Sequence, residues 1–92
     1  MLNRKNLLLN VYGKVQGVFY RTSAVTVAIE FGVNGTVQNM RDGSVQIEIE
    51  GTEEQLKNFI AWCWRGPELS MVTDIKVAEG AIKNFTDFRI IY

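Results

Sequence analysis

The 92-residue sequence contains no histidine, a single cysteine and a single proline. Without histidine there is no imidazole general base, no Ser-His-Asp triad and no imidazole metal ligand. The one cysteine, Cys63, excludes an intrachain disulfide and any cysteine-rich zinc or iron–sulfur site. Any chemistry must therefore be performed by arginine, lysine, carboxylates, amides, hydroxyls and the backbone.

A net charge is also absent, because ten Lys and Arg residues balance ten Asp and Glu residues. This balance argues against a protein that coats nucleic acid by bulk electrostatics. The charges are unevenly distributed, however, with five basic residues and one acidic residue before position 42. The excess of positive charge there fits either a local anion site or charge scattered over the surface.

Long hydrophobic runs are missing as well. The run Leu7-Leu8-Leu9 is far too short for a signal sequence or a membrane span. We therefore expect a cytoplasmic protein with no membrane partner and a reduced Cys63. The length and the 47% of apolar residues predict one domain over residues 1–92, with a core that needs no disulfide.

Several segments have the patterns of β-strands. Residues 7–12 form a short apolar run, and residues 44–50 alternate, with Val45, Ile47 and Ile49 on one face and Glu50 on the polar face. Residues 36–39 form a partner strand to residues 44–50, and the turn at Asp42-Gly43 between the two is typical of a hairpin. Residues 73–78 and 85–92 predict two further strands, the last with Phe88, Ile90 and Tyr92 on one face.

The clearest helix follows Thr52, which can cap it together with Gln55 in a capping box. Apolar residues then recur at helical spacing up to a stop at Gly66-Pro67. This stripe comprises Leu56, Phe59, Ile60, Cys63 and Trp64. We therefore expect Cys63 to be a small buried hydrophobic residue and Trp64 to belong to the core.

Residues 22–31 fit two structures. Val25, Val27, Ile29 and Phe31 alternate as in a strand, and Asn34-Gly35 could form a hairpin turn. Ala24, Ala28 and Phe31 instead mark one face of a helix that Gly32 would end. The local pattern leaves both open. A helix here gives the order βαββαβ plus a final strand, which is the α+β, ferredoxin-like sandwich: an antiparallel sheet with two helices on one face.

The segment Gly13-Lys14-Val15-Gln16-Gly17-Val18-Phe19-Tyr20-Arg21 would then join the first strand to that helix. Such a loop presents backbone N–H groups at the positive end of the helix dipole, which favours an anion. An arginine in the first helical turn is unfavourable unless a phosphate or carboxylate accompanies it. Arg21 could alternatively contact a surface carboxylate.

The same segment resembles the first motif of the acylphosphatase family. The residues Gly35-Thr36-Val37-Gln38-Asn39 and Asp42-Gly43-Ser44-Val45 resemble the second motif, and Gly51, Gly66-Pro67 and Phe88-Arg89-Ile90 also match. The resemblance spans nearly the whole chain. It implies the ferredoxin-like fold, and with it a helix at residues 22–31.

The resemblance also implies a function, the hydrolysis of acyl phosphates to a carboxylate and inorganic phosphate. By motif match, Arg21 is the phosphate-binding arginine and Asn39 positions the attacking water. The backbone N–H groups of five successive residues would hold the phosphate oxygens: Gln16, Gly17, Val18, Phe19 and Tyr20. We expect no cofactor and no metal, a small-molecule acyl phosphate as the partner, no nucleic acid, and a monomer.

The sequence departs from the family pattern at two positions. Tyr20 stands where phenylalanine is usual, and Thr36 replaces an aromatic residue, which could affect stability or rate. The alternative function is a non-catalytic phosphate-binding module of the same fold. RNA binding through a similar topology is disfavoured, because Gln46, Glu48 and Glu50 on the strand neither stack on bases nor attract phosphates.

Overall fold

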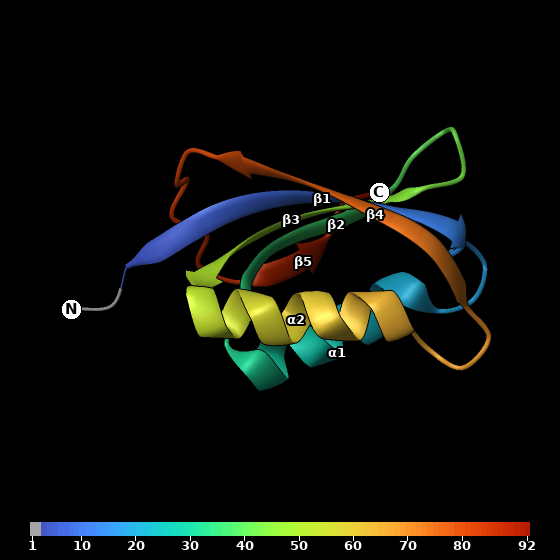
Figure 1. Cartoon of the computed structure of the whole chain (residues 1–92), viewed down its shortest axis with the longest axis horizontal. Coiled ribbons are helices and arrows are strands. Elements are labelled where there is room, and N and C mark those ends of the chain that lie inside the picture. Colours follow the sequence, from blue (N-terminus) through green and yellow to red (C-terminus); the bar gives the residue numbers. More distant parts are fainter. Residues whose placement is uncertain (1–2) are drawn as a thin grey trace.

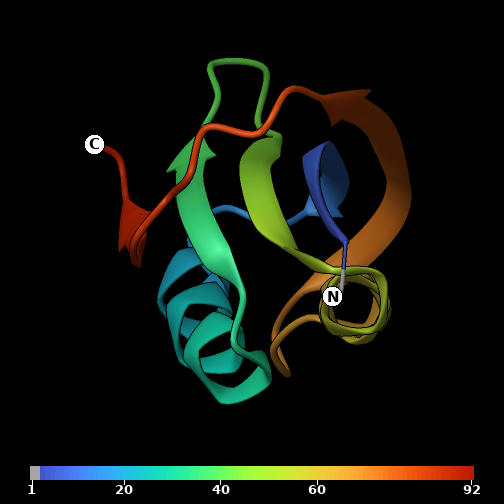
Figure 2. The same cartoon turned by 90° about the vertical axis from the view of Figure 1, so that its left-hand side faces the viewer.

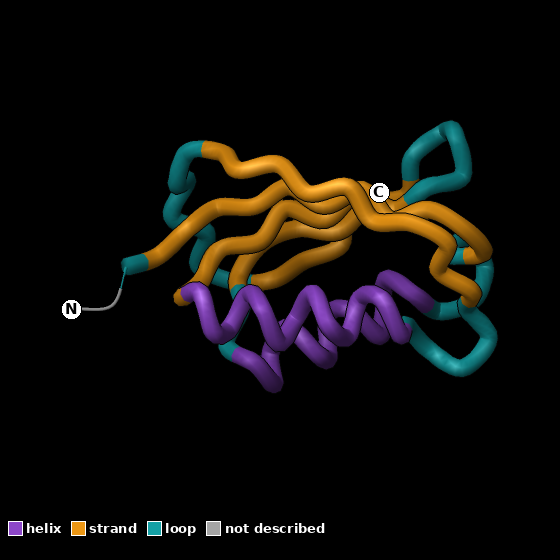
Figure 3. The backbone as a smooth tube through the Cα atoms, viewed as in Figure 1, coloured by secondary structure: helices purple, strands orange, loops and turns teal. Residues whose placement is uncertain are grey.

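A computed structural model describes residues 3–92 and places both helices on one face of a five-stranded sheet (Figure 1). In this part of the chain the opposite face carries no helix (Figure 3). The elements are β1 (Arg4–Lys14), α1 (Tyr20–Phe31), β2 (Asn34–Asn39), β3 (Val45–Thr52), α2 (Glu53–Arg65), β4 (Met71–Gly80) and β5 (Phe88–Ile90). The predicted ferredoxin-like fold class is confirmed. Among the described residues, no helix is both long and apolar enough to cross a membrane.

The strand order is β4-β1-β3-β2-β5, and the first four strands pair antiparallel. The fifth strand, β5, pairs parallel with β2, so the sheet is mixed rather than antiparallel throughout. The path of the chain explains this, because residues 81–87 cross the end of the sheet from one edge to the other (Figure 2). After this crossing the chain returns along the sheet in the direction opposite to β4. The strand β2 also runs in that direction, so β5 and β2 are parallel. The strand is also shorter than predicted, and Tyr92 beyond it is 98% exposed.

Residues 22–31 are helical, which settles the alternative that the local pattern left open. Ala24 and Ala28 are fully buried, and their small side chains let α1 pack closely on the sheet. Gly32 ends the helix at φ 73°, while the N–H of Val33 donates to the carbonyl oxygen of Ala28 over 2.8 Å. Ile29 is 71% exposed, so the alternation of β-branched residues does not mark a buried face.

The helix α2 begins with the predicted capping box. The N–H of Thr52 donates to Gln55 Oε1 over 2.9 Å, and the N–H of Gln55 donates to Thr52 Oγ1 over 3.3 Å. Cys63 is buried as predicted, but Trp64 is 48% exposed and Trp62 is buried in its place. Successive helical residues point about 100° apart. Because α1 lies beside α2, the buried face of α2 turns toward Trp62 and away from Trp64.

Glu50 lies on the polar face of β3, yet its carboxylate is fully buried, contrary to the prediction from the alternating pattern. The segment 81–87 covers it, with the N–H groups of Lys83 and Phe85 donating to the carboxylate over 2.5 and 2.9 Å. The amide of Asn6 donates a third hydrogen bond over 2.9 Å. Burial by itself would raise the pKa of Glu50. The three hydrogen bonds and the Arg4 charge together outweigh burial, so the pKa lies below its usual value.

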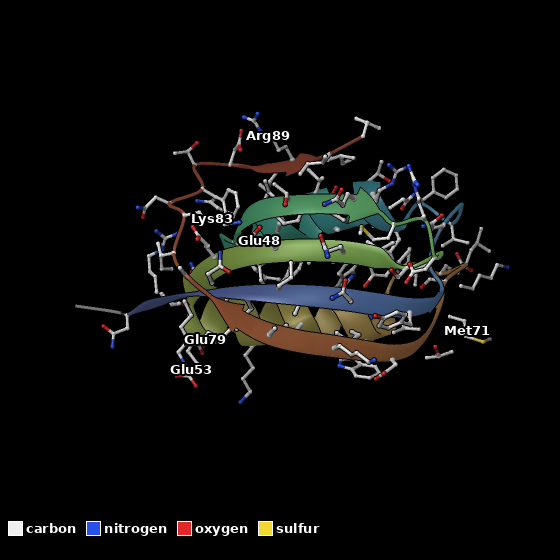
Figure 4. All side chains as sticks on the ribbon, turned by 90° about the horizontal axis from the view of Figure 1, so that it is seen from above. Glu48, Glu53, Met71, Glu79, Lys83 and Arg89 are labelled. Atoms are coloured by element: carbon white, nitrogen blue, oxygen red, sulfur yellow. The ribbon has the colours of Figure 1, made fainter. Side chains whose placement is uncertain are left out.

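Lys83 also pairs with Glu48 over 2.9 Å on the helix-free face, where Figure 4 shows the two side chains together. The crossing segment is therefore fixed to β3 by its backbone and by a side chain. Because β5 follows this segment directly, Glu50 and Glu48 help to determine where β5 meets β2.

Candidate active site

The loop that joins β1 to α1 has two residues in the left-handed conformation. We call residues 15–19 the cradle loop. Gly17 has φ 74° and Phe19 has φ 66°, and a bulky residue at positive φ is a genuine outlier. Left-handed residues within a turn direct neighbouring N–H groups toward a common concavity, which binds anions. Backbone strain of this kind concentrates at functional sites.

The start of α1 adds to this preference for an anion. Phe19 occupies the N-cap position without a side-chain hydrogen bond to the helix, and the first turn holds no acidic residue. The N–H groups at this end therefore lack both the usual cap and the usual negative charge. Arg21 brings a positive charge to the same turn, so two sources of positive potential meet there.

Arg21 and Asn39 line the same surface hollow, which has a volume of about 240 Å³. Asn39 is the last residue of β2 and shares the helix-facing side of that strand with the buried Val37. Arg21 reaches the hollow from the first turn of α1. The remaining lining residues are Val15, Gly17, Phe19, Tyr20, Thr22, Ile90 and Tyr92. The fold thus brings together two residues that lie far apart in the sequence.

The other predicted binding residues divide into two groups. Gly17, Phe19 and Tyr20 line the hollow, and Phe19 is 71% exposed, so it forms a wall and not part of the core. The side chain of Val18 is buried in the core, and that of Gln16 turns toward the β2–β3 turn. For all five residues the prediction concerns their backbone N–H groups, and it stays a prediction.

Arg21 has an aromatic neighbour that the sequence did not single out. The ring of Tyr92 lies 5.6 Å from the Arg21 guanidinium, a cation–π distance. Neither ion pair found within residues 3–92 involves Arg21, so the alternative of a surface carboxylate partner is not what the structure shows. Tyr92 reaches the site because β5 pairs parallel with β2, and no local motif signals that pairing.

Tyr20 anchors the start of α1 to the end of α2. Its hydroxyl donates to the carbonyl oxygen of Cys63 over 2.7 Å, and its ring packs against Trp62 with centroids 5.3 Å apart. In a continuing helix the N–H of residue 67 would reach this carbonyl, but Pro67 has no N–H. The Tyr20 hydroxyl therefore replaces a missing backbone donor, and burial raises the pKa of Tyr20.

Cys63 is not a candidate nucleophile in this structure. It is fully buried, and burial raises the pKa of its thiol to about 12. The thiolate would be a negligible fraction at neutral pH. Within residues 3–92 no group of three or more Cys, Asp or Glu side chains is arranged to hold a metal ion.

Comparison with known proteins decides the family. The acylphosphatase family model matches residues 7–90 of this chain. This chain belongs to the acylphosphatase family. The acylphosphatases of Marinobacter nauticus and Methylococcus capsulatus are 46% and 43% identical to it, covering 96% and 95% of this chain and 95% and 96% of those proteins.

A solved structure agrees with these relatives. The crystal structure of the acylphosphatase from Bacillus subtilis is 35% identical, with a TM-score of 0.93, covering 96% of this chain and 99% of that one. The predicted family, fold and enzyme class are thereby confirmed: this chain is an acylphosphatase. The comparisons favour acyl phosphate hydrolysis over the alternative of a non-catalytic anion-binding module.

Of the two departures from the acylphosphatase pattern, only one touches the hollow. Thr36 is half-buried and pairs with Glu48 and Arg89, and it lies on the face of β2 opposite to Asn39. Tyr20 lines the hollow and carries a hydroxyl that phenylalanine lacks.

Proposed function

We propose that this acylphosphatase holds the phosphoryl group of its substrate on the cradle loop and Arg21, while Asn39 orients the attacking water. One observation supports this proposal above all: Arg21 and Asn39, from α1 and β2, line one hollow beside an uncapped helix start. The proposed donors to the phosphate oxygens are the N–H groups of Gln16, Gly17, Val18 and Phe19 in the cradle loop and of Tyr20 at the start of α1.

The binding step follows from charge and shape. A phosphoryl group at the start of α1 supplies the negative charge that this helix end lacks. The guanidinium of Arg21 offers forked donors that match two phosphate oxygens. Binding of phosphate would therefore remove the unfavourable placement of a cation at a helix N-terminus.

The chemical step needs neither a strong acid nor a strong base. The leaving group of an acyl phosphate is a carboxylate, whose conjugate acid has a pKa near ~4, so it departs without being protonated. Phosphoryl transfer passes through a loose transition state with little bonding to the attacking water. The side-chain carbonyl of Asn39 can therefore act by orienting the water, and a phosphate oxygen can accept its proton.

Catalysis on this account consists of positioning and of electrostatic stabilisation by fixed donors. This chemistry requires no metal and no cofactor. An ordinary phosphate monoester has a much poorer leaving group, so we expect little activity on such compounds.

We further propose that the enzyme works as a monomeric single domain over residues 1–92, in the cytoplasm, on a free small molecule. The helix-free face presents Gln46 and Glu48, which do not favour a nucleic-acid partner.

Hydrolysis of benzoyl phosphate, measured with a chelator present, tests this proposal. Replacing Arg21 by Ala should lower kcat/KM by at least about a hundredfold, since it removes a charged donor to the transition state. Arg65→Ala, at an exposed arginine that ends α2, is the matched control and should retain the wild-type rate. Equal rates for wild type and Arg21→Ala would overturn the assignment of Arg21.

A further inference from the structure

The side chain of Gln16 leaves the cradle loop and reaches the turn that follows Asn39. Its Nε2 donates to the carbonyl oxygens of Met40 and Ser44 over 2.8 and 2.9 Å. Both acceptors belong to the β2–β3 turn, residues 40–44, which lies at the same end of the molecule as the cradle loop (Figure 1). Gln16 therefore links the two segments that carry the proposed phosphate donors and the proposed water-positioning residue.

The turn that Gln16 contacts is itself closed by hydrogen bonds. The N–H of Met40 donates to the carbonyl oxygen of Ser44 over 2.9 Å, and the N–H of Gly43 donates to that of Met40 over 3.1 Å. The carboxylate of Asp42 accepts the hydroxyl and the N–H of Ser44, and these bonds lower the pKa of Asp42. A side chain fixed to this turn is thus fixed to a defined frame.

The chemistry of the contact suits an amide. Two carbonyl oxygens face the Gln16 side chain, and a primary amide nitrogen has two N–H donors to give them. Methionine has a similar length but no donor, and an ionised glutamate would place negative charge against both oxygens. The neighbours in sequence matter too, because Gln16 directly precedes Gly17 in the hollow and Met40 directly follows Asn39.

We propose that Gln16 is a positioning residue for catalysis, which sets the distance and direction between the bound phosphoryl group and the amide of Asn39. This inference rests on the proposed function. In-line attack depends on that geometry, and a displacement of about 1 Å can cost about a hundredfold in rate. On this proposal the backbone N–H of Gln16 binds the phosphoryl group, and the side chain of Gln16 holds the turn that places Asn39.

The first test compares Gln16→Met with wild type in benzoyl phosphate hydrolysis. We expect kcat to fall by about ten- to a hundredfold, while inorganic phosphate inhibits both proteins equally, since the cradle loop and Arg21 remain. The matched control is Gln38→Met, at a half-buried glutamine of β2 whose amide bonds Gln46 on the helix-free face. It should keep the wild-type kcat.

A double-mutant cycle with Asn39→Ala separates positioning from general support of the fold. If Gln16 acts through Asn39, adding Gln16→Met to Asn39→Ala lowers kcat no further, because no side chain remains to be placed. The same fall in both backgrounds would overturn the proposal. If Gln16→Met fails to fold, Gln16→Glu replaces it: its protonated carboxyl can donate one hydrogen bond, so its kcat relative to wild type should rise as the pH falls.

The outcomes distinguish this inference from the proposed function. An active wild type with an equally active Gln16→Met contradicts the positioning role alone. A folded wild type that hydrolyses no benzoyl phosphate contradicts the proposed function, and the inference with it.

Discussion

Replacing Tyr20 by Phe should destabilise this protein. The substitution removes one hydroxyl and keeps the ring that packs on Trp62. The hydroxyl donates to the carbonyl oxygen of Cys63, which has no helical donor because residue 67 is proline. Tyr20→Phe therefore leaves a buried acceptor without a partner.

The size of the effect follows from that orphaned acceptor. An unsatisfied buried polar group costs about 1–3 kcal/mol. In a domain of this length, 1 kcal/mol corresponds to a change in Tm of about 4–8 °C. We therefore expect Tyr20→Phe to lower the free energy of unfolding by about 1–3 kcal/mol, and the Tm accordingly.

Urea unfolding followed by tryptophan fluorescence measures this loss directly. The control is Tyr12→Phe, at a half-buried tyrosine of β1 whose ring lies 5.6 Å from the Lys76 ammonium, a contact that phenylalanine preserves. It should change stability by less than about 0.5 kcal/mol. If Tyr20→Phe unfolds at the same urea concentration as wild type, the hydroxyl does not replace the missing backbone donor.

Three further predictions concern stability and binding. The folded pKa of Glu50 is lowered, so the contribution of Glu50 to stability is complete above the usual glutamate pKa of about 4.3 and is lost as the pH falls through the folded pKa. Glu50→Gln should therefore flatten the acid unfolding curve relative to that of the wild type. An alanine Cβ at Gly35 would collide with a carbonyl oxygen of β3, whereas a Cβ at Gly43 would meet open space. Gly43→Ala should therefore cost only backbone strain of about 1–3 kcal/mol, and Gly35→Ala should destabilise the protein more. Urea unfolding of the two variants compares their free energies of unfolding. Inorganic phosphate at about 100 times its Kd should stabilise the wild type by about 2.7 kcal/mol, and Arg21→Ala should lose most of this protection in thermal unfolding.

The fold was predictable where residue patterns are local. The capping box at Thr52 and the alternation of β3 place their elements correctly. The burial of Trp62 in place of Trp64 was not predictable, because the packing of α1 beside α2 decides which side of α2 is buried. The burial of Glu50 depends in turn on a segment more than thirty residues further along the chain.

The candidate site shows the same division. The loop motif and its arginine indicate an anion site from sequence, because a helix start and its charge are local properties. Tyr92 reaches the hollow only through the parallel pairing of β5, and the side chain of Gln16 contacts a turn more than twenty residues away. Both contacts are tertiary, and no spacing within the sequence encodes them.

The most direct test of the central claim is a measurement on Asn39→Ala, with Asn58→Ala at an exposed position of α2 as its control. The measurement is kcat for benzoyl phosphate together with the protection from thermal unfolding by inorganic phosphate. We predict that Asn39→Ala loses at least about a hundredfold in kcat while phosphate protects it as it protects the wild type. An unchanged kcat, or a loss of phosphate protection equal to that of Arg21→Ala, would contradict the division of roles between Arg21 and Asn39.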